Sequence, residues 1–480
     1  MPKIEPISIQ NLGVYGVIRQ ASVDDNLIPD GAVSHCLNCH FDRMGAITGR
    51  LGQTAMGNVV VSDKSCLGLY NALFEDSSKN CLLSVFSDGT NNDIYSYATG
   101  AWVKSLEDDT SGLKTRFATF SDNVIRVNGT DAMKCFDGSS WSTSGDPLNV
   151  DDIASTPTAH IAVYKSRVYT SGNSDYPDRL FFSSIIDTSG NITWTPGTDY
   201  VDINPSDGEN ISALYRFSLE LLIFKPNYIY RFKTSGVDPD PLIKIGTRSQ
   251  ESIVEGKKGV YFHHDTGFYR YSGGYPEEIS RPISDWVNNI SVANYDDIVG
   301  WNDNDHIKFS VGDVVINGIT YGNIVLRYTE SSEIWTIYSY NTQITAACSY
   351  KTSADLTRIV GDESGYVLID DYGYTDNGTA ISYEVETKWN SFGNITENKK
   401  ISSIVSIGEK PQGSELMYLS DDKEKWESIG QMTDFLNYHR NLNIEGHRIK
   451  FRISGISSYE PFVFLGLHLV EGLTEGVIPE

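Results

Sequence analysis

A candidate cofactor-binding motif occurs near the N-terminus, in the run Cys36-Leu37-Asn38-Cys39-His40. The pattern C-x-x-C-H is the attachment signature of c-type haem, in which two thiols form thioethers and the adjacent histidine ligates iron. With His35 included, the same segment could instead offer two thiolates and two imidazoles to a zinc ion. Both are cofactor hypotheses that the rest of the chain has to support.

The context of this segment argues against both cofactors. Residues 1–6 read MPKIEP, so two prolines and an acid stand where a secretory signal would have its apolar core. Haem attachment of this type belongs outside the cytoplasm, and no second Cys/His pair lies nearby to complete a zinc site. We therefore expect cytoplasmic synthesis, reduced thiols, no metal and no cofactor, with the two cysteines incidental to a β-structured arm.

Signatures of catalysis are missing from the rest of the sequence. It contains no G-x-S-x-G elbow, no H-E-x-x-H, no Walker A loop and no G-x-G-x-x-G. The adjacent His263 and His264 lie in a predicted strand, where alternation sends their side chains to opposite faces. We predict no catalytic residue and no enzymatic activity.

A basic stripe near the C-terminus needs a different explanation. Arg448, Lys450 and Arg452 alternate with Ile449 and Phe451, so three like charges share one face of a predicted strand. The chain as a whole carries a formal net charge of -25. The stripe is either a solvated face or a contact with an acidic partner surface or a DNA backbone.

The composition predicts the kind of secondary structure that carries these residues. The 480 residues are 40% apolar and 21% charged, with 28 Tyr and 42 Gly, which is typical of an all-β protein with many tight turns. No apolar run is long enough to span a bilayer. The acidic balance disfavours gripping nucleic acid through its phosphates, although the protein could still surround DNA.

A loose repeat predicts the architecture. An aromatic strand, a polar turn, a second strand ending in Tyr or Phe and then Gly before a Trp-bearing strand recur between residues 61 and 375. We expect about seven four-stranded β-propeller blades there; two or three unrelated β-sandwiches are the alternative. One short helix is predicted from the spacing of Ile283, Trp286, Val287 and Ile290.

The flanking regions differ from the repeats. Residues 1–60 have the texture of an extended arm with turns. Residues 376–480 contain longer alternating strands and predict a C-terminal β-sandwich. The expected order is therefore arm, propeller and sandwich.

The arm also carries a family resemblance. It resembles a recurrent phage opening, in which N-L-P-x-G-A is followed by N-x-x-F-D-x-x-G-x-x-x-x-R-x-G. The pattern differs here at Ile28 and Leu51, where the phage opening often has Pro. The matching residues are Asn26-Leu27-Ile28-Pro29-Asp30-Gly31-Ala32, Asn38, Phe41-Asp42-Arg43-Met44-Gly45-Ala46-Ile47 and Arg50-Leu51-Gly52.

The end of the chain is similar to the last domain of the podovirus packaged-DNA stabilisation (tail-needle hub) family, over Leu416–Trp426, His439-Arg440 and His447–Ile453. This resemblance implies a structural protein of the virion tail, assembled in the host cytoplasm. Six copies would form a ring below the portal and its adaptor, enclose DNA without binding it specifically, and meet the tail tip or fibres. It assigns no individual site residue.

The resemblance leads to a further expectation about the basic stripe. In a ring of acidic chains, Arg448, Lys450 and Arg452 should face a neighbouring subunit or virion protein, and reversing all three charges should block assembly but not folding. The alternative function is a receptor-binding propeller that binds or cleaves carbohydrate, since aromatic β surfaces suit both.

Overall fold

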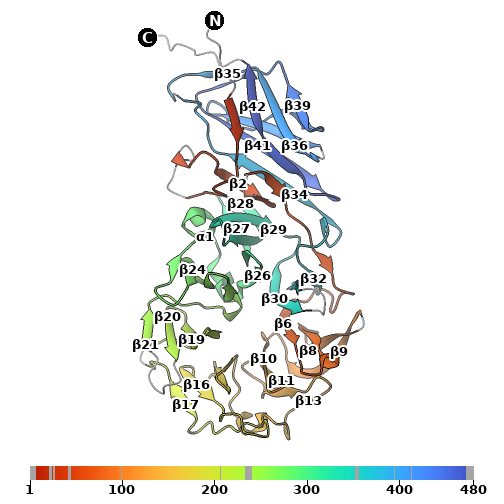
Figure 1. Ribbon diagram of the computed structural model, residues 1–480, viewed down its shortest axis with the longest axis vertical. Coiled ribbons are helices and arrows are strands. Elements are labelled where there is room, and N and C mark those ends of the chain that lie inside the picture. The colour runs from red at the N-terminus through yellow and green to blue at the C-terminus, as the bar shows by residue number, and fades with distance from the viewer. Residues whose placement is uncertain are drawn as a thin grey trace.

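The computed structural model shows a two-part, all-β molecule. It describes residues 7–471 except 21–23, 25–26, 42–44, 99, 206, 233–239, 352–355, 394 and 412. Strands make up 52% of it and helices 6%, which confirms the predicted fold class. Figure 1 shows small sheets arranged in a ring in the lower body, below an upper body of longer strands. Residue 26 and residues 42–44 of the phage-like opening lie outside the described part.

The lower body is a β-propeller built from four-stranded antiparallel units, in which each strand pairs with the next along the chain, except that the fourth strand of the last unit comes from the N-terminal segment. The units are β6 (Cys66–Ala72), β7 (Cys81–Ser87), β8 (Asn91–Ala98), β9 (Ala101–Thr110); β10 (Arg116–Phe120), β11 (Asn123–Val127), β12 (Lys134–Phe136), β13 (Trp141–Ser142); β14 (His160–Tyr164), β15 (Arg167–Ser171), β16 (Arg179–Phe182), β17 (Tyr200–Asp202); β18 (Ala213–Phe217), β19 (Glu220–Lys225), β20 (Tyr228–Phe232), β21 (Asp240–Ile243); β22 (Val254–Gly256), β23 (Gly259–His264), β24 (Gly267–Tyr271), β25 (Glu277–Glu278); β26 (Val299–Asp303), β27 (His306–Ile316), β28 (Ile319–Thr329), β29 (Ile334–Ser339); and β30 (Ile344–Lys351), β31 (Leu356–Asp362), β32 (Val367–Ile369) with β5 (Thr54–Ala55).

The ring closes on itself. The first strands of neighbouring units contact one another from β6 through β10 and β14 to β18, and from β22 through β26 and β30 back to β6. The units that begin with β18 and β22 share an apolar core around Phe224 and Phe262. Because β29 also joins β26–β28 to a ten-stranded sheet of the upper body, this unit is no isolated blade, and the number of about seven blades stays a prediction.

The upper body has two sheets. One contains β3 (Cys39–Phe41), β4 (Ile47–Gly49), β42 (Val463–Glu471), β36 (Ser403–Glu409) and β39 (Leu436–His439), with β1 (Ile7–Gln10) also on β42; the other continues from β29 through β2 (Val33–Leu37), β34 (Thr379–Thr387), β41 (Ile449–Ser457), β37 (Ser414–Ser420) and β38 (Glu427–Met432), with β33 (Thr375–Asp376) on β34. A small ladder joins β35 (Lys399–Ile401) to β40 (Ile444–Gly446). Buried side chains from both sheets, such as Ile404 and Phe451, belong to one core cluster.

N-terminal strands belong to both bodies. β1 pairs with β42 and β2 pairs with β34 in the upper body, whereas β5 completes the last propeller sheet through β32. In Figure 1 the red N-terminal strands accordingly lie beside blue C-terminal ones. The domain boundaries near residues 60 and 375 stay predictions, and the structure adds that described strands between residues 7 and 55 pair with both bodies.

Helical structure is confined to short turns. The predicted helix is confirmed as α1 (Ser284–Val287), which follows the 3-10 turn η5 (Arg281–Ile283), and its apolar residues are buried. Within the described residues, no helix has the length and apolar character needed to cross a bilayer. The other 3-10 turns within the described residues are η2 (Ser77–Lys79), η3 (Val150–Ile153), η4 (Gln250–Ser252) and η6 (Val292–Asp297).

Candidate functional site

The C-x-x-C-H segment forms the corner at which the chain crosses between the two upper sheets. Asn38 adopts a positive φ of 59° between β2 and β3, and the thiols of Cys36 and Cys39 on either side are fully buried in the apolar core. Cys39 Sγ lies 3.4 Å from the Leu37 carbonyl oxygen, to which it donates. Burial raises the pKa of the Cys39 thiol well above its ordinary value, so this thiol is a poor nucleophile and a poor ligand.

The two histidines of the same segment point to different surroundings. His35 stacks on Trp286 of α1 with ring centroids 6.0 Å apart, whereas His40 Nδ1 lies 3.5 Å from the Tyr338 hydroxyl. Within the described residues, no group of three His, Cys, Asp or Glu side chains could hold a metal ion. The absence of cofactors remains a prediction from sequence.

The histidine pair of β23 is likewise divided. His263 packs edge-on against Tyr295 with ring centroids 4.7 Å apart, whereas His264 Nδ1 lies 2.8 Å from the Thr266 hydroxyl. Burial lowers the pKa of the His263 imidazole to about 3. His263 packs against aromatic rings, whereas His264 has local hydrogen-bond partners, so the two rings lie in different surroundings.

The basic stripe does lie along one face of the strand β41. The intervening Ile449 and Phe451 are fully buried on the opposite face, as alternation requires. Lys450 and Arg452 belong to β41, and Arg448 immediately precedes it.

Acidic groups of the same chain meet this stripe. Lys450 Nζ lies 2.8 Å from Glu386 Oε2, and Arg452 Nε donates to Glu386 Oε1 at 3.0 Å. Arg452 Nη1 also lies 3.5 Å from Glu384 Oε2. Burial alone would raise the pKa of the Glu386 carboxyl, but the charge of Lys450, with smaller contributions that include Arg452, lowers it to about 2. Glu386 is therefore a charged carboxylate held between two cations.

Arg448 is placed differently from its two neighbours. Its guanidinium lies 3.5 Å from Asp24 and 3.9 Å from Asp421, and its Cζ lies 5.2 Å from the centre of the Trp389 ring. Because these ion pairs are longer than the 2.8 Å pair of Lys450, they constrain the Arg448 side chain less. The predicted contact with another subunit stays a prediction, and Arg448→Ala would test it with less risk to the fold than reversing all three charges, which would place new acids beside Glu386.

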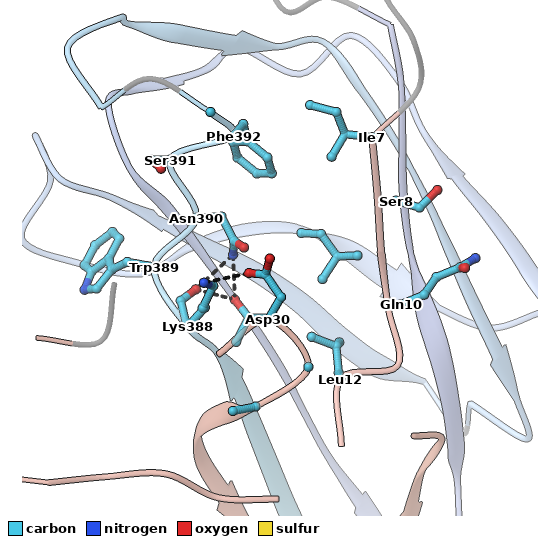
Figure 2. Close-up of a pocket in the computed structure, with 15 residues that line it drawn as sticks. Ile7, Ser8, Gln10, Leu12, Asp30, Lys388, Trp389, Asn390, Ser391 and Phe392 are labelled. Carbon is cyan, nitrogen blue, oxygen red and sulfur yellow. Dashed lines mark hydrogen bonds and ion pairs between the residues drawn. The ribbon is translucent and has the colours of Figure 1, made fainter. Parts of the chain in front are cut away.

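A pocket of about 420 Å³ lies beside Trp389, between β1 and the loop after β34. Figure 2 shows Ile7 and Leu12 pointing toward Phe392 across the pocket, while Ser8 and Gln10 point away. Near its lower end, Lys388 Nζ lies 2.7 Å from Asp30 Oδ1. The pocket thus joins an apolar wall to an ion pair.

The upper sheet that contains β42, β36 and β39 carries an apolar patch on its outer face, at the edge formed by β39. The cross-strand partners Val405 and Tyr438, and likewise Ile407 and Leu436, lie on one face of β36 and β39. Tyr438 is 62% exposed and Leu436 is 41% exposed. β39 is the last strand of its sheet in the described residues, so apolar side chains and an open backbone edge coincide. We call these four residues the outer-face patch.

The centre of the propeller is bridged by an ion pair. Arg116 of β10 donates to both carboxylate oxygens of Glu251 in η4, at 2.7 and 3.0 Å. Burial alone would raise the pKa of this carboxyl, but Arg116 and Lys114 lower it to about 2. Sequence patterns do not predict this contact, because 135 residues separate the partners.

Arg50 belongs to the phage-like opening, and its role is structural. Its Nε donates to Asn38 Oδ1 at 2.8 Å, and its Nη1 and Nη2 donate to the two oxygens of Asp376 at 2.7 and 2.5 Å. Nearby, a Cβ on Gly52 would lie 2.1 Å from the Thr375 carbonyl oxygen. The spacing N…R-x-G thus corresponds to a buried polar corner that only a glycine can approach so closely.

Comparison with known proteins gives structural neighbours only. No protein-family model matches the chain, and no curated protein matches it. It is similar to BBS1N in complex with ARL6DN, at 11% identity and a TM-score of 0.41 over 67% of this chain and 96% of the other. It is also similar to the Neurospora crassa Pan2 WD40 domain, at 8% identity and a TM-score of 0.39 over 67% and 94%. The propeller assignment rests on the strand pairing described above.

Proposed function

We propose that this protein is a non-enzymatic structural component of a phage short tail, in which several copies, six by the family resemblance, form a ring around the DNA path. The resemblance of the N-terminal and C-terminal segments to the tail-needle hub family supports the proposal. Within the ring, the chain would contact the portal adaptor on one side and the tail tip or fibres on the other.

The outer-face patch is the observation that carries the proposal. Exposed apolar residues on an edge strand are a template for pairing with another chain, and monomeric proteins usually blunt such edges with charges or prolines. β39 itself reads Leu-Asn-Tyr-His, without a proline, lysine or acid, and Arg440, which follows the strand, places its Cζ 5.6 Å from the centre of the Tyr438 ring. A neighbouring copy that covers this edge would bury Tyr438 and Leu436.

The charge of the chain supports the same function. A net charge of -25 gives a ring wall that repels phosphates, so DNA could pass without the counterion release that accompanies tight binding. Association must then depend on apolar contact and local pairing of charges, because copies of one acidic chain repel each other.

A second candidate function is carbohydrate recognition, and the pocket of Figure 2 favours it. The Phe392 ring, the Asn390 side chain and the Lys388–Asp30 ion pair meet there, a mixture of apolar wall and few polar groups that is typical of small-ligand sites. A monomer that binds a glycan would support this function and not the ring.

The test compares the mass in solution of three purified chains by sedimentation. The wild type should sediment as a ring, and Tyr438→Glu should sediment as a folded monomer, because it places a charge in the outer-face patch. Tyr275→Glu is the matched control, since Tyr275 is 82% exposed and lies in the propeller. A wild-type monomer, or a Tyr438→Glu variant that assembles as well as Tyr275→Glu, would refute the proposal.

A further inference from the structure

A second pocket lies where the propeller meets the upper body. Its volume is about 460 Å³, within the range of small-molecule sites. The walls come from β2, α1, the β27–β28 hairpin, β34 and β41, which converge at the junction in Figure 1. We call it the junction pocket, and its lining includes Arg19, His35, Asp285, Glu386, Lys450 and Arg452.

His35 is the first sign of a ligand in this pocket. Its side chain is 96% buried, and neither Nδ1 nor Nε2 has a hydrogen-bond partner within the described residues. Nε2 lies 3.4 Å from Glu384 Oε1, but without the geometry of a hydrogen bond. A buried polar group left unpaired costs about 1–3 kcal/mol, and such groups call for an ion, a water or a ligand.

Arg19 supplies a second unfilled donor. Its Nε donates to Asp285 at 2.7 Å, and its Cζ lies 5.9 Å from the centre of the Trp286 ring. Its two terminal nitrogens make no hydrogen bond to any described residue. The guanidinium is thus oriented by one bond and one ring, with a pair of N–H groups still available for a planar or tetrahedral acceptor.

The charge of the lining favours the same kind of ligand. The cations Arg19, Lys450 and Arg452 outnumber the lining acids by one, and each acid already has a cation beside it: Asp285 has Arg19, and Glu386 has Lys450 and Arg452. The lining residues therefore carry one excess positive charge, while Glu384, which lies just outside the lining, also pairs with Arg452 at 3.5 Å.

From these observations we infer that the junction pocket binds the oxyanion group of a small ligand, a phosphate or a carboxylate. The oxyanion accepts from a His35 N–H and from the terminal nitrogens of Arg19, with Lys450 and Arg452 supplying further positive charge. Because Arg19 and His35 lie in the N-terminal segment and Lys450 and Arg452 lie in β41, the bound group would tie together residues far apart in sequence. This site does not depend on ring assembly.

The test follows the His35 ring by NMR in the full-length protein with isotope-labelled histidine nitrogens. The His35 signals are assigned by their loss in His35→Gln. Inorganic phosphate and acetate are titrated separately, with potassium chloride of equal ionic strength as the reference. We expect a saturable shift of the His35 signals with either anion and no shift with chloride. The anion that binds with the lower Kd identifies the class of oxyanion.

A variant locates the effect. Arg19→Met should weaken binding by roughly tenfold, the change expected when a charge-assisted hydrogen bond is lost. Arg179→Met is the matched control, because Arg179 pairs with Asp202 at 2.8 Å in the propeller, remote from the junction. If Arg19→Met folds poorly, the titration of the wild-type protein alone tests the inference. Shifts that do not saturate, equal shifts with chloride, or unchanged binding in a folded Arg19→Met would overturn the inference.

Discussion

Arg50 shows how much of this structure depends on single buried charges. Its guanidinium joins the β2–β3 corner at Asn38, the β33 strand at Asp376 and the end of β29, where it donates to the Ser339 carbonyl at 2.9 Å. Both charged side chains of the pair are nearly inaccessible to water. Breaking such a pair leaves one buried charge without compensation, which costs far more than losing an exposed pair.

We therefore predict that Arg50→Met lowers the free energy of unfolding by about 3–5 kcal/mol. Lys400→Met is the control, because Lys400 pairs with Glu445 at 2.7 Å on the surface, and its loss should cost about 1 kcal/mol at most. Denaturant unfolding followed by Trp fluorescence measures both. Equal effects of the two substitutions would show that Arg50 is dispensable.

The Glu251 carboxylate is expected to make the stability of the protein depend on pH in the acid range. Its folded pKa of about 2 lies below the ordinary glutamate value of 4.5, so the unfolded chain binds a proton at a higher pH than the folded one. The stability that the ionised group contributes is therefore complete above about pH 5 and is lost as the pH falls toward 2. Glu251→Gln should be less stable at neutral pH and should lose less stability on acidification. An unchanged pH profile of the thermal midpoint in Glu251→Gln would contradict this explanation.

The short strand β5 contributes more to the propeller than its two residues suggest. It supplies the fourth strand of the last propeller sheet through two residue pairs with β32, just after the close approach of Gly52 to Thr375. The propeller is thus completed by a segment that is remote in sequence from its other strands.

We predict that Gly52→Ala destabilises the protein by about 1–3 kcal/mol or more, because the added Cβ would meet a carbonyl oxygen that cannot move freely. Gly197→Ala is the control, since a Cβ there meets nothing within 4 Å and should be close to neutral. Thermal unfolding of both variants is the measurement. A Gly52→Ala protein as stable as Gly197→Ala would mean that the backbone relaxes at no cost.

Local patterns predicted the elements well and their partners poorly. The spacing of Ile283, Trp286, Val287 and Ile290 was enough for α1, because helical periodicity is a property of neighbouring residues. The alternation of β41 likewise predicted which face would be buried. In contrast, the acids opposite the stripe, the Arg116–Glu251 pair and the pairing of β5 with β32 join segments from 66 to more than 300 residues apart, which local spacing cannot predict.

For the whole molecule, net charge sets how copies can associate. A chain of charge -25 repels its own copies, and the repulsion between exposed charges is screened beyond ~10 Å at 0.1 M salt. If the outer-face patch provides the contact between copies, apolar burial drives their association and electrostatic repulsion opposes it.

We therefore predict that added sodium chloride, from low to moderate concentration, shifts the protein toward the assembled form. Sedimentation velocity at a fixed protein concentration measures the shift, and Tyr438→Glu should not respond. Dissociation with added salt would point instead to attraction between opposite charges, with Arg448 and its neighbours as the first residues to examine.

We propose that copies of this chain form a closed ring, and single-particle electron microscopy of the purified protein can show this. We expect ring-shaped class averages, six-fold if the family resemblance holds, with a mass of six times the 53.3 kDa of one chain. The upper-body edge that carries β39 should lie against the next copy. Class averages showing only separate two-part particles, at concentrations where the protein stays soluble, would contradict it.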